Sequence, residues 1–314
     1  MLAVARLAAH KLRARWRGWA ALAAITAIAG GAVLAALAGA IRTDTAYPRF
    51  LAASKASDVL ASPAGPGIGG YDAALGRLPG VAASAAVVGI NAVPVNASGV
   101  PGGAVMTASL DGRYGRDLEI PKMLAGRLPG ADAPGEIAVD QLGARQLNLH
   151  VGSVLPMAAL DSSNHARPLT EHVVGVFVTR GSVVPVTDLD RVPKIAASLA
   201  LYRELGPAYQ AFDGAFVRLQ PGVSIAAFTG AAERLAQRYP PTGKQVYVAD
   251  EAAQATTIER AIRPQAVALA LFALALAVTA LLIVGQVAAR TLLAAACGRI
   301  ARSMVAAWVA SSAT

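Results

Sequence analysis

The 314-residue sequence is poor in charged residues, in aromatic residues and in cysteine. Charged side chains make up 15% of the chain, against roughly 25% in an average globular protein, whereas 55% of the residues are hydrophobic. Intrinsically disordered chains have the opposite balance, so that class is excluded. A single cysteine, Cys297, excludes a scaffold held together by disulfide bonds. The composition indicates a protein with long apolar segments in a membrane.

The motifs of common enzyme and metal sites are also missing. Gly243-Lys244 is followed by glutamine, and no glycine precedes it at the spacing of an ATP-binding P-loop. No Gly-x-Ser-x-Gly motif of a serine hydrolase occurs, and the histidines lack the spacing of a zinc site. Asp188 and Asp190 form a carboxylate pair that could do acid–base chemistry, but we interpret it as a solvated turn. We therefore expect no enzyme activity, no catalytic residue, no metal and no cofactor.

The net charge of +9 is concentrated at the two ends of the chain. Residues 1–17 contain five basic and no acidic residues, residues 290–314 contain three and none, and the remainder is nearly neutral. A nucleic-acid site would instead interleave basic and aromatic residues on one surface. Nucleic acid is therefore not an expected partner.

Two long uncharged runs, Trp19–Ile41 and Ala266–Ala289, predict transmembrane helices over residues 19–41 and 264–289. The first run would be about 35 Å long as a helix, enough for a hydrocarbon core of about 30 Å. Since short basic segments stay in the cytoplasm, residues 1–18 form a cytoplasmic arm and residues 290–314 a cytoplasmic tail. The prediction is a multi-pass protein of the plasma membrane with both termini in the cytoplasm.

The first run has two further features. Ala38-Gly39-Ala40 resembles a signal-peptidase site, so a cleaved signal peptide is an alternative to a membrane span. Small residues also recur every fourth position and would allow another helix to approach closely, although an alanine-rich helix acquires such a stripe by chance as readily. These helix-packing candidates are Ala23, Ala27, Gly31, Ala35 and Gly39.

Residues 42–263 are then an extracytoplasmic domain, in which valine-rich strands alternate with helices. The expected strands are Asp58–Ala61, Ala86–Ile90, Ala104–Ser109, Glu136–Val139, His172–Val178, Gly214–Leu219 and Gln245–Val248. The expected helices are Tyr71–Leu78, Gln141–Leu147, Lys194–Tyr202 and Ser224–Tyr239. The fold class is therefore an α+β extracytoplasmic domain, with two lobes, flanked by two transmembrane α-helices. A polar helix over Ala249–Arg263 would link domain motion to the second span, unless it breaks near Pro264.

Nine short sequence segments, called phrases below, occur in order over about residues 1–290 and resemble the FtsX-like (MacB-type) family of ABC transporter permeases. They are Tyr47-Pro-Arg-Phe-Leu-Ala-Ala-Ser54, Ala56-Ser-Asp-Val59, Gly126-Arg-Leu-Pro129, Gly135–Gly152, His172–Val176, Val183–Asp190, Val217–Gly222, Ala249–Gln254 and Val284-Gly-Gln286. That family has one span, a large extracytoplasmic core domain and then further spans. The tail after residue 297 departs from this pattern, so we expect a C-terminally truncated, N-terminal half of such a permease. Alternatively, Ile300, Met304 and Trp308 make a short interfacial helix.

The resemblance implies a permease subunit that works with a separate ATP-binding subunit and handles lipid, lipoprotein, peptide or drug cargo. Residues 23–39 would pack the first span against membrane lipid, a second copy or other permease spans. Residues 249–263 would couple motion, and residues 42–248 would contact cargo. The alternative is a two-span extracytoplasmic sensor or binding protein without an ATPase partner.

Overall fold

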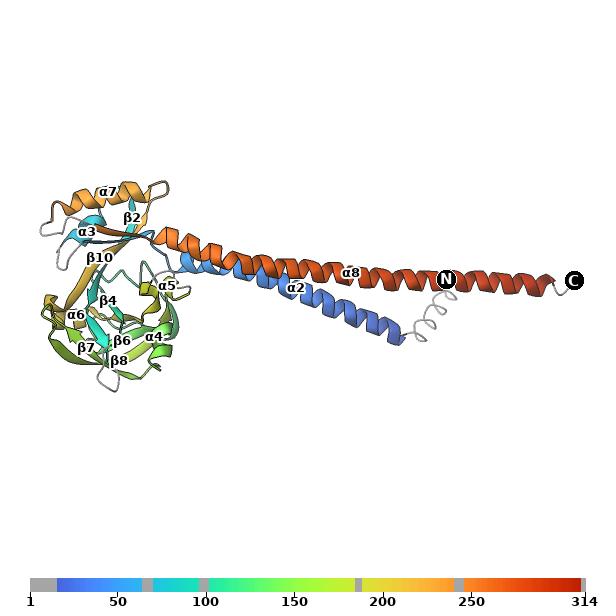
Figure 1. Ribbon diagram of the computed structural model, residues 1–314, viewed down its shortest axis with the longest axis horizontal. Helices are drawn as coiled ribbons and strands as arrows, with labels where there is room; N and C mark the ends of the chain where they lie inside the picture. The colour runs from blue at the N-terminus through green and yellow to red at the C-terminus, as the bar shows by residue number, and fades with distance from the viewer. Residues whose placement is uncertain (1–15, 64–69, 96–101, 184–187, 240–245, 312–314) are drawn as a thin grey trace. The chain divides into compact units, whose positions relative to one another are not determined.

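The computed structural model describes residues 16–63, 70–95, 102–183, 188–239 and 246–311 (Figure 1). The chain divides into two compact units. One is residues 47–261, and the other combines residues 1–46 with residues 262–314.

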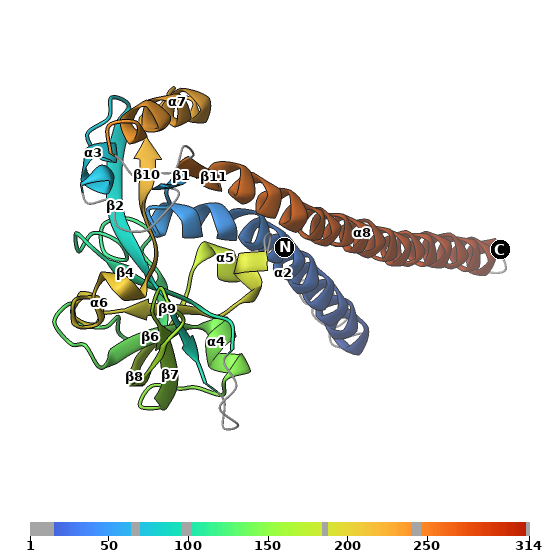
Figure 2. The ribbon, with the colours of Figure 1, turned by 60° about the vertical axis from the view of Figure 1, so that its left-hand side comes forward.

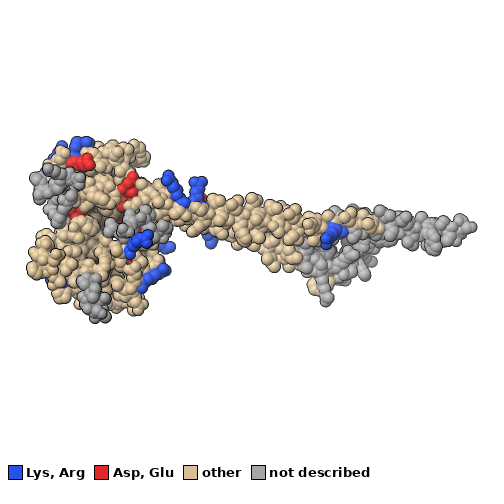
Figure 3. Space-filling view, in the orientation of Figure 1, with Lys and Arg blue, Asp and Glu red and all other residues tan. Residues whose placement is uncertain are grey.

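Two long helices, α2 (Trp16–Ala53) and α8 (Glu251–Ser311), begin and end the described chain. Both are long and apolar enough to cross a membrane, with mean hydropathies of 2.1 and 2.9 in their apolar parts. In Figure 3 their described surface carries few charged side chains. Pro264 lies inside α8, so the helix does not end there. Residues 251–263 and the second apolar run therefore share one helical backbone, whereas residues 249 and 250 of the predicted helix Ala249–Arg263 belong to strand β11 (Val246–Asp250).

The unit of residues 47–261 is an α+β domain, as the sequence predicts. Its strands are β1 (Val59–Pro63), β2 (Val81–Ile90), β3 (Ala92–Pro94), β4 (Val105–Ser109), β5 (Lys122–Gly126), β6 (Glu136–Asp140), β7 (Val154–Leu160), β8 (Ala166–Val178), β9 (Lys194–Ala197), β10 (Gln210–Leu219) and β11 (Val246–Asp250). Its short helices are α3 (Tyr71–Leu75), α4 (Gln141–Gln146), α5 (Arg180–Val183), α6 (Leu199–Leu205) and α7 (Ile225–Ala236), with 3-10 turns η1 (Asp188–Arg191) and η2 (Pro207–Tyr209). The strands pair in the order β11-β1-β10-β2-β4-β9-β6-β8-β7-β3, and β5 pairs with β8.

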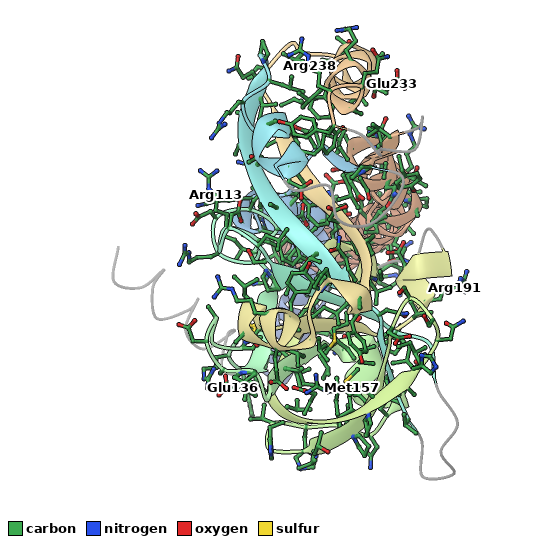
Figure 4. The ribbon with its side chains drawn as sticks, turned by 90° about the vertical axis from the view of Figure 1, so that its left-hand side faces the viewer. Arg113, Glu136, Met157, Arg191, Glu233 and Arg238 are labelled. Atoms are coloured by element: carbon green, nitrogen blue, oxygen red, sulfur yellow. The ribbon has the colours of Figure 1, made fainter. Side chains whose placement is uncertain are left out.

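Part of this sheet closes into a barrel. Only Asn91 separates β2 from β3, and β2 pairs with β4 whereas β3 pairs with β7. The path β4-β9-β6-β8-β7 therefore returns to the strand from which it started. Its interior holds fully buried side chains such as Met106, Ile137, Met157 and Ile195, and Figure 4 labels Met157 inside it. We call these strands the barrel lobe.

The second lobe is built from β11, β1, β10 and the first part of β2, covered by α3 and α7 (Figures 1 and 2). It has its own core, in which Tyr71 and Leu75 of α3 and Phe228 of α7 pack on Val59 and Val217 of the sheet. We call it the α/β lobe. Strand β2 contributes Val88 and Ile90 to the barrel core and Val81 to the core of the α/β lobe, and β10 pairs with it from Ile90 to Val81, so this pair of strands connects the two lobes.

The predicted helix Lys194–Tyr202 is wrong in its first half. Residues 194–197 form β9, which pairs in parallel with β4 and antiparallel with β6. Helix α6 begins only after Ser198, whose hydroxyl accepts a hydrogen bond from Leu201 N at 3.0 Å. The central place in the sheet outweighs the helix-forming tendency of Lys194–Ala197.

Candidate functional site

The segment that follows α2 is held in place from two sides. Lys55 has a left-handed backbone (φ 48°), which ends the helix, and the carbonyl of Ser54 accepts a hydrogen bond from Ile120 N at 2.7 Å. The guanidinium group of Arg218 donates to the carbonyl of Ala56 from both Nε and Nη2, each at 3.2 Å. The end of α2 is thereby joined to the β4–β5 loop and to strand β10.

The first turn of α8 is bonded to the same segment. The N–H groups of Glu251 and Ala252 donate to the carbonyl of Asp58 at 2.9 and 3.1 Å. The Asp58 carboxylate accepts from Leu219 N at 2.7 Å, and the Asp250 carboxylate caps α8 through Ala253 N at 2.7 Å. Residues 54–58, which directly follow α2, therefore join the first turn of α8 to strand β10.

A buried ion-pair cluster lies at this junction. Arg180, the first residue of α5, approaches Glu119 at 3.1 Å and Glu251 at 2.9 Å. It also donates to the carbonyl and the hydroxyl of Ser57 at 2.9 and 3.1 Å, while the N–H and hydroxyl of Ser57 donate to Glu119. We call Arg180, Glu119, Glu251 and Ser57 the Arg180 cluster. It joins four elements that are far apart in the sequence.

The charged side chains of the Arg180 cluster are largely buried. The three ionic side chains are only 10–13% exposed. Burial raises the pKa of Glu251, whereas the neighbouring Arg180 lowers it. With two carboxylates and one guanidinium, the cluster carries one excess negative charge, and loss of Arg180 would leave both carboxylates buried without a counter-charge.

A cavity of about 730 Å³ opens between the two lobes, beside the cluster. One wall is aromatic, since Tyr114 stacks on Phe216 with ring centroids 5.1 Å apart and planes at 12°. Phe212 belongs to the same wall, and its ring occupies the space that a side chain on Gly89 would need. Strands β4 and β9 contribute Val105, Thr107 and Ala196.

Tyr47 of α2 lines the cavity, and its hydroxyl group forms no hydrogen bond with a described residue. The residue is 3% exposed, and its oxygen has no hydrogen-bond partner among the described residues. Burial raises the pKa of Tyr47 to about 12. The side chain is therefore a neutral phenol, able to donate and to accept one hydrogen bond at neutral pH.

The interpretation of Asp188 and Asp190 as a solvated turn is wrong for Asp190. Its side chain is buried at the cavity, 3.4 Å from the ammonium group of Lys194. Gly181 lies against the carboxylate, because a side chain there would overlap it. Four residues of the phrase Val183–Asp190, numbers 184–187, lie outside the described residues.

Four of the five small residues of the predicted packing stripe, Ala23, Ala27, Gly31 and Ala35, are exposed on α2. A side chain on Gly39 would lie 3.8 Å from Leu269, whereas one on Gly31 would have nothing within 4 Å. The stripe is thus not covered by the described residues of the chain, and its role in packing stays a prediction.

Three of the family-like phrases meet at the junction, namely 47–54, 56–59 and 249–254. Sequence reasoning missed Arg180 and Glu119, which lie outside these phrases. The available signal for Arg180 was a lone arginine directly after the apolar strand His172–Val178. Glu119 gave no local signal. Among the described residues, no group of three His, Cys, Asp or Glu could hold a metal ion.

No protein-family model and no curated protein matches the chain. Three similar solved structures are extracytoplasmic or permease domains. The periplasmic region of MacB from Actinobacillus actinomycetemcomitans is 12% identical, with 64% of this chain and 92% of that one covered and a TM-score of 0.39. A domain of a putative permease protein from Porphyromonas gingivalis is 15% identical (61% and 88% covered, TM-score 0.36). The extracellular domain of the noncanonic ABC-type transporter YknZ from Gram-positive bacteria is 10% identical (61% and 98% covered, TM-score 0.42).

Proposed function

We propose that the chain is a permease subunit, or the N-terminal half of one, in an ABC transport system of the plasma membrane. A separate ATP-binding subunit supplies the energy, because the sequence has no P-loop. The membrane helices pass movement to the extracytoplasmic domain, which handles a lipid, lipoprotein, peptide or drug. Both termini are in the cytoplasm, as the basic end segments predict.

The observation that carries the proposal is the junction of α2 and α8. Residues 54–58, which directly follow one apolar helix, bond to the first turn of the other helix through Asp58 and to strand β10 through Ala56 and Asp58. The Arg180 cluster adds the β4–β5 loop and α5 to this connection. If either helix moved along its axis, the force would therefore act on strand β10, which pairs with β2 along both lobes, and not on a flexible linker.

The test is affinity capture of the tagged full-length chain from its native membranes, followed by quantitative mass spectrometry. We expect an ATP-binding subunit at near-stoichiometric yield. Recovery of the chain in membranes without any ATPase would overturn the transporter role.

The packing stripe supplies a matched pair of variants for the same capture. Gly30 and Gly31 are adjacent and exposed, with open space around both, but only Gly31 belongs to the stripe. If the stripe packs against other permease spans or a second copy, Gly31→Ile reduces their recovery and Gly30→Ile does not. Equal recovery with both variants would contradict the packing role and leave the transporter role intact.

The second candidate function is a two-span sensor or binding protein. The cavity favours it, because Tyr47 of α2 and Gln254 and Ile258 of α8 line the same space. A bound ligand would thus touch both helices that lead to the membrane. Capture of a signalling protein in place of an ATPase would support this reading.

A further inference from the structure

We infer that the cavity between the lobes binds an uncharged amphiphile, whose apolar body lies against the aromatic wall and whose polar group hydrogen-bonds to the hydroxyl of Tyr47. This binding needs no ATP-binding subunit. Its failure would leave the proposed function untouched, and its success does not depend on that function.

The size and lining of the cavity select the apolar body. A volume of about 730 Å³ falls within the range of about 300–1,000 Å³ that small-molecule sites occupy. Tyr114, Phe212 and Phe216 present aromatic surface, and Leu60 and Leu128 add aliphatic surface. Such a lining favours a hydrocarbon or aromatic body over a polar solute.

The charges of the cavity select against an anion. Arg180 is committed to Glu119 and Glu251, and Lys194 to Asp190. These five groups sum to one negative charge. The remaining lining cation, Arg116, has a side chain that is 74% exposed, so water screens it. A carboxylate, sulfonate or phosphate inside the cavity would lose hydration without gaining an uncommitted cation.

The hydroxyl of Tyr47 is a buried polar group at the cavity that has no hydrogen-bond partner among the described residues. A buried hydroxyl without a partner costs free energy, and a ligand group that bonds to it recovers that cost on binding. Because Tyr47 is neutral, it suits an amine, hydroxyl, ester or amide of the ligand. The place of the ligand's polar group is thereby defined by one atom, the hydroxyl oxygen of Tyr47.

The test uses the full-length chain in nanodiscs and two fluorescent probes with the same anilinonaphthalene body. N-phenyl-1-naphthylamine is uncharged, whereas 1-anilinonaphthalene-8-sulfonate differs from it by one sulfonate. We expect saturable binding of the uncharged probe and at least about tenfold weaker binding of the sulfonate. Equal affinities for the two probes would refute the charge selection.

One pair of variants separates binding in the cavity from binding elsewhere in the sample. Ala196→Phe fills the cavity next to Thr107, and Thr170→Phe places the same ring on an exposed position of β8. The first should weaken the uncharged probe at least about tenfold and the second should leave it unchanged. If both variants bind like wild type, the probe lies elsewhere and the site does not exist.

Tyr47→Phe removes only the oxygen atom, which makes no bond within the described chain, so the fold should survive. We expect affinity for the uncharged probe to fall about three- to tenfold, the value of one hydrogen bond. Unchanged affinity would refute the assignment of Tyr47. Elution as a single species and unchanged resistance to protease serve as folding controls for all variants.

Discussion

Replacement of Arg180 by methionine should destabilise the extracytoplasmic domain strongly at neutral pH. The side chain makes four contacts, to Glu119, to Glu251 and to two atoms of Ser57, and is only 10% exposed. Its loss leaves two buried carboxylates without a counter-charge, which costs about 3–5 kcal/mol. For a unit of the size of residues 47–261, that loss corresponds to a fall in Tm of about 6–20 °C.

The loss of unfolding free energy caused by Arg180→Met should also depend on pH. Burial raises the pKa of Glu251, and without the guanidinium group the opposing effect of Arg180 is lost, so this pKa in the folded variant lies further above its unfolded value of about 4.3. The folded variant therefore takes up protons as the pH falls, so it regains stability relative to wild type towards about pH 5. Pulse proteolysis in urea at pH 5 and 7.5, read on peptides from 47–261, measures both effects.

Arg127→Met is the matched control. Arg127 makes a bidentate ion pair with Glu136 at 2.6 and 2.7 Å, but its side chain is 59% exposed. Removal of such a solvent-screened surface pair costs much less than removal of a buried one. If Arg180→Met costs no more than Arg127→Met, or if its deficit is the same at both pH values, the account of the Arg180 cluster is wrong.

Three further predictions concern the domain and its orientation. Glu171 of β8 is buried, and burial raises its pKa to about 7, so its ionisation should lower domain stability by roughly 3 kcal/mol as the pH rises from about 4.5 to above 7. Glu171→Gln should remove this contribution in urea titrations, while the contribution of Asp72, whose pKa burial also raises to about 7, remains. Gly126→Ala should lower Tm by at least about 4 °C in thermal unfolding, because the new side chain would overlap the backbone of β8 and φ is +65°, whereas Gly135→Ala should not. An impermeant maleimide added to intact cells should label Thr170→Cys in a Cys297→Ser background and should not label Cys297 itself, whereas the reverse pattern would contradict the proposed orientation.

The local elements of the domain were predictable from the sequence where side-chain pattern and capping agree. All seven expected strands occur, with shifted ends, because their valine-rich alternation matches a half-buried sheet. Helix α7 was predicted from Ser224 and the apolar positions 225, 228 and 235. Its Ser224 hydroxyl accepts a hydrogen bond from Ala227 N at 3.2 Å, and Phe228 and Leu235 are buried.

The non-local arrangement could not be predicted in the same way. Strands β3 and β5 are short or exposed, and β9 looks helical until β4 and β6 flank it. Closure of the barrel depends on the single residue between β2 and β3, which leaves no periodic signal. Formation of the Arg180 cluster needs contacts between residues 62–123 positions apart, and no spacing rule connects them.

Several residues in the segments that carry the family resemblance have a structural role in this fold. Asp140 caps α4 through Gly143 N at 2.8 Å, accepts from Lys194 N at 3.1 Å and from the Ser182 hydroxyl at 3.1 Å, and is fully buried. Gly126 lies where β5 crosses β8 too closely for a side chain. Such residues fix the fold, so they indicate the architecture of the domain rather than its cargo.

The central claim is that ATP hydrolysis by a partner moves the junction between the apolar helices and the domain. Hydrogen exchange of peptides 47–60 and 249–258, measured on the captured assembly in nanodiscs, tests it most directly. The account predicts that exchange in both peptides changes together when ATP is hydrolysed, and that Arg180→Met uncouples the two. Identical exchange with and without ATP turnover in both peptides would contradict it.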